Sequence, residues 1–162
     1  MAAAEAYRYW LNTWSDVQTH LPTLYAHARG NVLELGVRAG VSTSALLAGV
    51  EAHGGHVWSV DRDDCSPVFA GHPQWTFTQA DSLDVPGIPD ALDLLFIDTE
   101  HTEDRTIAEL QLWGSAAKLI MLHDTDDGST YPGVRNAIAA YCAETGRRAS
   151  FHDGSYGLGI IE

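Results

Sequence analysis

The chain has 162 residues, of which 45% are hydrophobic and 19% charged, so it is long enough and apolar enough to bury one core. Nine Lys and Arg residues against 22 Asp and Glu residues give a net charge of -13 at pH 7, which would repel both a nucleic-acid backbone and an anionic membrane surface. This composition excludes a disordered chain and predicts a single domain over residues 1–162 that binds neither nucleic acid nor membrane.

Cysteine content and the N-terminal residues indicate the compartment. Cys65 and Cys142 are the two cysteines, too few for a disulfide framework and without the paired spacing of a zinc site. Residues 1–10 contain no apolar segment of signal-peptide length, and no run approaches the ~18 apolar residues of a membrane span. We therefore expect a cytoplasmic protein.

The N-terminal third combines a helical pattern with a strand, a glycine turn and a second helix. Apolar residues from Trp14 to Leu24 recur with helical spacing, and Pro22 is expected to divide them into a helix pair. A run of β-forming residues over 31–36 then ends in glycine, and residues 42–51 carry apolar side chains on one helical face.

The remaining elements indicate the fold class. Four further strands, each ending in an acid, are predicted over residues 56–61, 76–81, 92–98 and 117–124, and helices over 102–113 and 134–142. Alternation of strands and helices favours a parallel sheet covered on both faces. The terminal ASFHDGSYGLGIIE favours two strands joined by a turn at 153–155. The prediction is a doubly wound α/β fold with a mainly parallel seven-stranded sheet and a C-terminal antiparallel hairpin.

Ligands of such sheets bind beyond the carboxyl ends of the strands, where these acids converge. The turn from Glu34 to Gly40 contains two glycines just before a helix N-terminus, which favours close approach of a ligand, although two glycines four apart also fit a simple tight turn. Asp61 could accept hydrogen bonds from both hydroxyls of a ribose. Asp81, followed by Ser82, could accept one from an adenine amino group, while helix capping or solvation would also explain both acids.

The sequence VLELGVRAGVSTSALL, followed by VWSVD, FTQADS, LDLLFID and LIMLHD, resembles the class I S-adenosylmethionine-dependent methyltransferases from about residue 31 to the C-terminus. The resemblance implies a Rossmann-like fold and S-adenosyl-L-methionine as the cofactor. It places Glu34 near the methionine amino group, Asp61 on the ribose and Asp81 on the adenine. The cofactor-binding residues that it implies are Glu34, Gly36, Val37, Gly40, Ser42, Asp61, Arg62, Asp81, Ser82 and Asp98. A dinucleotide fingerprint would have glycine in place of Glu34, so an NAD-dependent oxidoreductase is the weaker alternative.

The segment IDTEHTEDRTIAELQLW, with LHD on the next strand, is similar to a branch of small-molecule O-methyltransferases. This branch includes metal-dependent enzymes that act on antibiotic sugars, catechol O-methyltransferases and cephalosporin hydroxylase-like proteins. The resemblance implies magnesium bound by Asp98 and Asp124, with His101 as the catalytic base. Magnesium prefers hard oxygen ligands, and a cation on a hydroxyl lowers the pKa of that hydroxyl.

The sequence also departs from these enzymes. Thr99 replaces a common glycine, and Thr125 stands where catechol-type enzymes have an amide ligand, so the third metal ligand is open between Asp126, Asp127, His123 and water. A helix start capped by Thr99 or Thr102 would also explain the residues around His101. Tyr131 is placed to touch a substrate.

The expected activity is methyl transfer to a hydroxyl oxygen of a small molecule. The chain has no long insertion to cover its substrate, so the pocket is expected to be open or completed by a second subunit in a homodimer. The alternative from another class is a non-catalytic methyltransferase-like domain that binds the cofactor or a partner.

Overall fold

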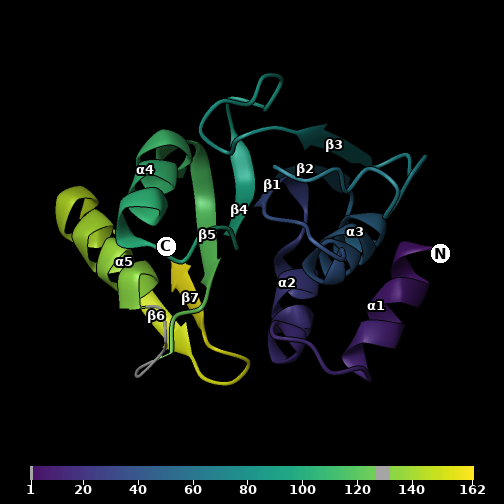
Figure 1. Ribbon diagram of the computed structural model, residues 1–162, viewed down its shortest axis with the longest axis horizontal. Coiled ribbons are helices and arrows are strands. Elements are labelled where there is room, and N and C mark those ends of the chain that lie inside the picture. Colours follow the sequence, from purple (N-terminus) through teal and green to yellow (C-terminus); the bar gives the residue numbers. More distant parts are fainter. Residues whose placement is uncertain (1, 127–131) are drawn as a thin grey trace.

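The computed structural model describes residues 2–126 and 132–162. It consists of one seven-stranded sheet between two layers of helices (Figure 1), with strand order β3-β2-β1-β4-β5-β7-β6. The first five strands are parallel, and β7 runs antiparallel to both β5 and β6, so the predicted fold class is confirmed. The strands are β1 Gly30–Leu35, β2 Gly55–Asp61, β3 Trp75–Gln79, β4 Leu92–Ile97, β5 Ala117–His123, β6 Ala149–His152 and β7 Leu158–Ile161.

The helices cover the sheet in two groups. One face packs against α1 Ala3–Leu11, α2 Leu21–His27 and α3 Val41–His53, and the other against α4 Glu103–Trp113 and α5 Pro132–Thr145 (Figure 1). Short 3₁₀ turns, η1 Gln18–His20 and η2 Gly114–Ala116, precede α2 and follow α4. Because side chains alternate along a strand, Leu94 and Phe96 of β4 enter the first core while Leu95 and Ile97 enter the second.

The prediction of a helix pair over the segment from Trp14 to Leu24 was partly wrong. The first helix, α1, lies before the predicted segment, and Trp14 lies outside any helix with 78% of its surface exposed. Pro22 does not break a helix. It lies in the first turn of α2, where backbone N–H groups have no partner within the helix, so proline costs no hydrogen bond there.

The predicted alternation of strands and helices was also too regular. It holds from β1 through α3 to β2 and from β4 through α4 to β5, but residues 62–74 and 80–91, all of them described, contain no helix. Strand β3 at the sheet edge is therefore only partly covered, which its intermediate burial reflects.

The order of the strands reverses between β1 and β4. The chain proceeds from β1 outward to β3 and then returns to build β4 and β5 on the other side. The amide of Asp98 donates to the Leu35 carbonyl (2.8 Å), and that of Gly36 donates to the Val60 carbonyl (2.9 Å). These bonds extend the sheet past the strand ends, so the segments that follow β1, β2 and β4 start from one edge, the usual ligand position in such sheets.

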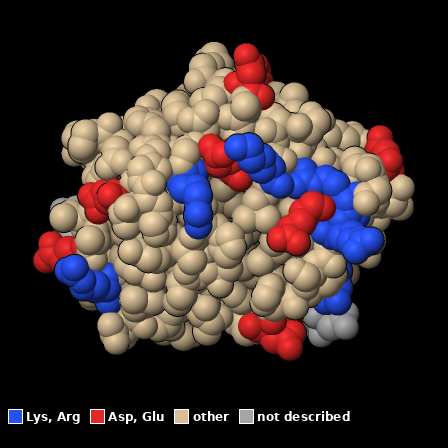
Figure 2. Space-filling view, turned by 180° about the vertical axis from the view of Figure 1, so that it is seen from behind, with Lys and Arg blue, Asp and Glu red and all other residues tan. Residues whose placement is uncertain are grey.

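Charged side chains are mixed over the surface. On the face shown in Figure 2, Lys and Arg side chains lie next to Asp and Glu side chains near its centre. In the part of the chain that the structure describes, no helix has the length and apolar character needed to cross a lipid bilayer.

Helix α3 packs closely against α2 at Gly49, so replacing this glycine by alanine is expected to destabilise the protein rather than stabilise it. Alanine normally stabilises a helix interior by ~1 kcal/mol relative to glycine. A Cβ on Gly49, however, would lie 2.6 Å from the Cβ of Ala28 and from the Tyr25 carbonyl oxygen. Since overpacking costs about 1–3 kcal/mol, Gly49→Ala is expected to lower the free energy of unfolding, measured by urea denaturation.

The matched control is Ala140→Gly, at an exposed position within α5. It calibrates the intrinsic difference between alanine and glycine in this protein. A Gly49→Ala variant stabilised by that same amount would show that α2 and α3 can separate without cost.

Candidate active site

The glycine turn after β1 lies directly against the end of β4. Gly36 has a φ of 95°, and a Cβ there would stand 2.0 Å from the Asp98 carbonyl oxygen. Gly40, with a φ of 75°, precedes the first turn of α3, and its Cβ would meet the Val68 side chain at 2.3 Å. Both positions therefore favour glycine for conformation and for space.

Asp61 ties this turn to the end of β2. Its Oδ2 accepts from the amides of Val37 (2.7 Å) and Arg38 (3.0 Å), and its Oδ1 accepts from the amide of Asp63 (2.9 Å). Burial raises the pKa of Asp61, but the hydrogen bonds from these backbone amides have the larger effect and bring the pKa below its usual value. The Cys65 thiol also donates to this carboxylate, and Asp61 is thus held in the ionised form at the edge of the first cavity.

Two adjoining cavities open on the edge formed by the ends of β1, β2 and β4. The first, of about 300 Å³, extends over the ends of β1, β2, β3 and β4, and the second, of about 360 Å³, lies between the glycine turn and residues 10–17. Gly36, Arg38 and Asp98 line both. Of the predicted cofactor residues, the first cavity includes Gly36, Asp61, Arg62, Ser82 and Asp98, and the second includes Gly36, Val37, Ser42 and Asp98.

Glu34 supports the turn from inside the protein. It is fully buried, and its carboxylate accepts hydrogen bonds from the hydroxyls of Ser42 (2.7 Å), Thr43 (2.9 Å) and Ser59 (2.6 Å). Burial raises its pKa to about 7, although the three hydroxyls oppose this. Glu34 lines neither cavity, and its predicted contact with the methionine amino group stays a prediction.

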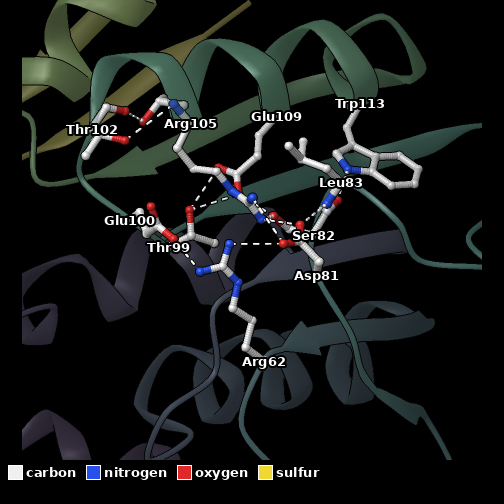
Figure 3. A network of polar contacts seen from close by, with 11 residues as sticks. Arg62, Asp81, Ser82, Leu83, Thr99, Glu100, Thr102, Arg105, Glu109 and Trp113 are labelled. Atoms are coloured by element: carbon white, nitrogen blue, oxygen red, sulfur yellow. Dashed lines mark hydrogen bonds and ion pairs between the residues drawn. The ribbon is translucent and has the colours of Figure 1, made fainter.

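Asp81 is held by two arginines (Figure 3). Arg105 of α4 donates to Asp81 Oδ1 at 2.5 Å, and Arg62 donates to Oδ2 at 3.0 Å while also pairing with Glu100. Hydrogen bonds from Arg105 and from the Leu83 amide hold the pKa of Asp81 well below its usual range. The carboxylate lines neither cavity, so its predicted contact with adenine also stays a prediction.

The sequence reasoning missed the centre of this network. Glu109 is fully buried on α4, where it accepts from Arg105 Nε (3.1 Å), from the Thr99 hydroxyl (2.9 Å) and from the Ser82 hydroxyl (Figure 3). Arg105, Ser82 and Thr99 line the first cavity. The available signal was the spacing of Arg105 and Glu109, because residues four apart face the same side of a helix.

The ends of β4 and β5 bring the predicted metal ligands and base together. His101 Nε2 lies 2.8 Å from Asp124 Oδ2 and 3.6 Å from Asp98 Oδ1. Asp124 has a φ of 60°, unusual for a residue with a side chain and typical of functional sites. Thr102, one of the two predicted caps, accepts a hydrogen bond from the Arg105 amide and so begins α4 directly after His101.

His123 joins the same cluster. Its Nδ1 lies 3.0 Å from Asp124 Oδ2 and 3.4 Å from Asp98 Oδ1, and one ligand atom from each of Asp98, His123 and Asp124 falls within 4.8 Å of the others. Of the other third-ligand candidates, Asp126 is not in this group, and Asp127 lies outside the described residues, as does Tyr131.

Charge coupling in this cluster is strong. Asp124 and Asp98 raise the pKa of His101 to about 9, against the opposing effect of burial. Burial lowers the pKa of His123, but the same two carboxylates have a larger, opposite effect and raise it to about 11. Burial raises the pKa of Asp124, and the two histidines bring it well below its usual range. The cluster therefore holds two carboxylates in the ionised form, balanced by positive charge.

The sheet order and the crevice at the reversal point define a class I methyltransferase fold, and a family model agrees. Residues 33–125 match the model of a methyltransferase domain family, so the chain belongs to that family. This confirms the resemblance noted in the sequence. No curated protein matches the chain.

Solved structures show the same fold at low sequence identity. SAH-bound methyltransferase PaMTH1 from Podospora anserina has a TM-score of 0.65 and 12% identity over 99% of this chain and 87% of that one. The O-methyltransferase NovP has a TM-score of 0.68 and 13% identity over 90% and 79%. MycE, from the mycinamycin biosynthetic pathway and solved with Mg, SAH and mycinamycin VI, has a TM-score of 0.64 and 13% identity over 100% and 53%.

The buried Glu34 predicts a pH-dependent stability. Because its folded pKa, about 7, exceeds its ordinary value of 4.5, the stability that its protonated form contributes is full below pH 4.5 and is lost as the pH rises through 7. Glu34→Gln removes this dependence. The free energy of unfolding of the variant relative to wild type should therefore rise by about 2–3 kcal/mol between pH 5 and pH 8, measured by denaturant titration.

Glu144→Gln, at an exposed position of α5, is the control and should show no comparable trend. A constant difference between Glu34→Gln and wild type across this range would mean that Glu34 is already ionised in the folded protein at pH 5.

Proposed function

We propose that this chain transfers a methyl group from S-adenosylmethionine to a hydroxyl oxygen of a small molecule, with a divalent metal at Asp98 and Asp124 and with His101 as the base. The observation that carries the proposal is that these three side chains meet beside two cavities, which Asp98 borders. Asp98 lines both cavities, and His101 contacts both carboxylates. The cofactor would occupy the edge over the glycine turn and the acceptor the neighbouring space.

The residues around the turn fit the cofactor. Gly36 lines both cavities without a side chain of its own, and Asp61 presents an ionised carboxylate to the first cavity. S-adenosylmethionine, when bound, supplies an electrophilic methyl group. The protein's contribution is to fix the orientation of the two reactants and to exclude water, which can account for much of a rate enhancement.

The paired acids fit a divalent cation. Asp98 and Asp124 are hard oxygen ligands on neighbouring strand ends, close enough for both to contact one histidine. A cation held there would act as a Lewis acid and lower the pKa of the acceptor hydroxyl.

His101 has the position of a general base but needs the right protonation state. With its pKa raised to about 9, it is an imidazolium at pH 7 when only the carboxylates surround it. Once Asp98 and Asp124 share their charge with a cation instead, His101 can be neutral and accept a proton from the acceptor hydroxyl at Nε2.

The first test is cofactor binding. S-adenosylhomocysteine at about 100 times its Kd should raise the melting temperature by about 5–10 °C, because it binds only the folded chain. Asp61→Asn should weaken this binding, since an amide is a poorer acceptor for ribose hydroxyls than a carboxylate. Calorimetric titration of both proteins with S-adenosylhomocysteine and with NAD gives the affinities.

Asp64→Asn is the matched control, because Asp64 is exposed three residues further on and lines neither cavity. An unchanged wild-type melting temperature at millimolar S-adenosylhomocysteine would remove the cofactor from the proposal. Binding of NAD in its place would favour the oxidoreductase.

The second test separates chemistry from cofactor binding. Asp124 and His101 line neither cavity, so Asp124→Asn and His101→Ala should keep wild-type affinity for S-adenosylhomocysteine. Removing a positioned base typically lowers turnover by ~10²- to 10⁴-fold, and His101→Ala should recover part of it at higher pH, where the hydroxyl ionises unaided. Production of S-adenosylhomocysteine over a panel of small hydroxyl compounds, with magnesium or chelator, measures turnover.

The exposed His152→Ala serves as the control for histidine removal. Full turnover by Asp124→Asn in excess chelator would exclude a metal at this site. Cofactor binding by wild type without turnover on any compound of the panel would favour the non-catalytic, partner-binding alternative.

A further inference from the structure

His123 places a second imidazole nitrogen, besides that of His101, against the carboxylates of Asp98 and Asp124. It is the last residue of β5 and is 2% exposed. Its Nδ1 faces both carboxylates, 3.0 Å from Asp124 Oδ2 and 3.4 Å from Asp98 Oδ1. Ligand atoms about 2.1 Å from a common ion lie about 3.0 Å apart at an octahedral angle and about 3.4 Å apart at a tetrahedral angle. The two distances from His123 therefore fit ligands of one ion, and one ligand atom from each of the three residues lies within 4.8 Å of the others.

The other ring nitrogen of His123 determines which form of the imidazole faces the carboxylates. Its Nε2 lies 2.7 Å from the Ser155 carbonyl oxygen and 3.0 Å from the Asp16 carbonyl oxygen. Since carbonyl oxygens only accept, Nε2 must carry a hydrogen, and a neutral ring then has its lone pair on Nδ1. A ligating histidine commonly donates its second N–H to a backbone carbonyl in this way.

The turn that supplies one of these carbonyls is held in an unusual conformation. Ser155 and Tyr156 both have left-handed backbones, with φ values of 42° and 63°. The Ser155 hydroxyl accepts from the Thr19 amide, and the Tyr156 carbonyl accepts from the Asp126 amide. The ring of His20 packs edge-on to that of His123, with centroids 6.1 Å apart. The orientation of the His123 ring is thus fixed by two segments far apart in the chain, residues 16–20 and residues 155–156.

We infer that Asp98, Asp124 and His123 Nδ1 form a two-oxygen, one-nitrogen site that prefers a divalent transition metal such as Mn²⁺, Co²⁺ or Zn²⁺ to Mg²⁺. Imidazole nitrogen suits transition metals, whereas Mg²⁺ favours oxygen ligands and water. The inference rests on the proposed function for the two carboxylates and adds the ligand and the metal preference. His123 acts as a positioning residue for the metal, and His101 keeps the role of base that the proposed function gives it.

The experiment measures metal binding directly, without turnover. Calorimetric titration of the whole chain with Mn²⁺, Co²⁺, Zn²⁺ and Mg²⁺ should give an affinity at least about 10-fold higher for Co²⁺ and Zn²⁺ than for Mg²⁺. His123→Asn should weaken Co²⁺ and Zn²⁺ binding by about 10- to 100-fold and Mg²⁺ binding much less. The exposed His152→Asn is the matched control and should bind all four ions as wild type does.

Nitrogen coordination is read from the Mn²⁺-loaded proteins by pulsed electron paramagnetic resonance. ¹⁴N modulation from an imidazole should be present in wild type and in His101→Ala and absent in His123→Asn. If His123→Asn does not fold, the ring-nitrogen NMR spectrum of ¹⁵N-labelled, Zn²⁺-loaded wild type replaces it, and one Nδ1 resonance should move on loading.

Two results would overturn the inference: ¹⁴N modulation lost in His101→Ala but kept in His123→Asn, or tighter binding of Mg²⁺ than of the transition metals. Either one leaves the methyltransferase proposal standing with oxygen ligands. Failure of S-adenosylhomocysteine to bind, measured separately in chelator, would remove the proposed function and leave the metal result to be judged alone.

Discussion

The site depends on the contact between Gly36 and the backbone of Asp98. The two residues lie where the strand order reverses, and no side chain fits between them, since a Cβ on Gly36 would lie 2.0 Å from the Asp98 carbonyl oxygen. This contact presses the glycine turn onto the end of β4 and leaves Asp98 between two cavities. Asp61 then fixes the turn from the other side through the amides of Val37 and Arg38. A displacement of the turn would alter both cavities at once, because they share its residues.

Buried and partly buried carboxylates gather around this contact, and each is stabilised in a different way. Glu34 accepts hydrogen bonds from three hydroxyls, and burial raises its pKa to about 7 against their effect. Asp61 has backbone amides and Asp81 has arginines, and both have a lowered pKa. Asp98 and Asp124 share two histidines. Amide and arginine partners favour fixed, ionised acids, whereas histidine partners can give up their protons, so the pair at Asp98 and Asp124 is the one able to exchange protons for a metal ion.

Much of this arrangement could be predicted from the sequence because parallel strands bring their carboxyl ends to one edge. Asp61 ends a strand, and Asp98 and Asp124 directly follow one; the apolar runs of these strands are clear, so the convergence of the three acids followed from the fold class alone. Pairings that depend on side-chain direction could not be predicted in the same way. Nothing in the run LIMLHD indicates that the His123 ring turns toward the acids, since its direction depends on carbonyls of Asp16 and Ser155, far away in the chain.

In the N-terminal segment the sequence predicted a regular element that the structure does not contain. Spacing of apolar residues around Trp14 favoured a helix, but residues 12–17 run across the carboxyl edge without helical structure, and Trp14 and Val17 help to line the second cavity. A pattern of apolar residues shows that side chains meet an apolar surface, and a cavity wall meets that condition as well as a helix face. The same ambiguity explains why Arg105 and Glu109 were overlooked, because a charged pair four residues apart is ordinary on an exposed helix.

The charges at the crevice also bear on how a cofactor would be exchanged. Three arginines line the first cavity, and each is paired with acidic side chains. Arg38 pairs with Asp16, Arg62 pairs with Asp81 and Glu100, and Arg105 pairs with Asp81 and Glu109. Asp98 faces two histidines with a raised pKa, whereas Asp61, ionised and without an arginine or histidine partner among the described residues, contributes uncompensated negative charge to the first cavity. A negative field attracts a sulfonium cation more than the neutral thioether that remains after methyl transfer. For S-adenosylmethionine as cofactor, this difference favours binding of the reactive form and release of the spent one. The strongly acidic composition of the chain acts in the same direction, since ions of one sign over the surface add to the potential inside a partly enclosed crevice.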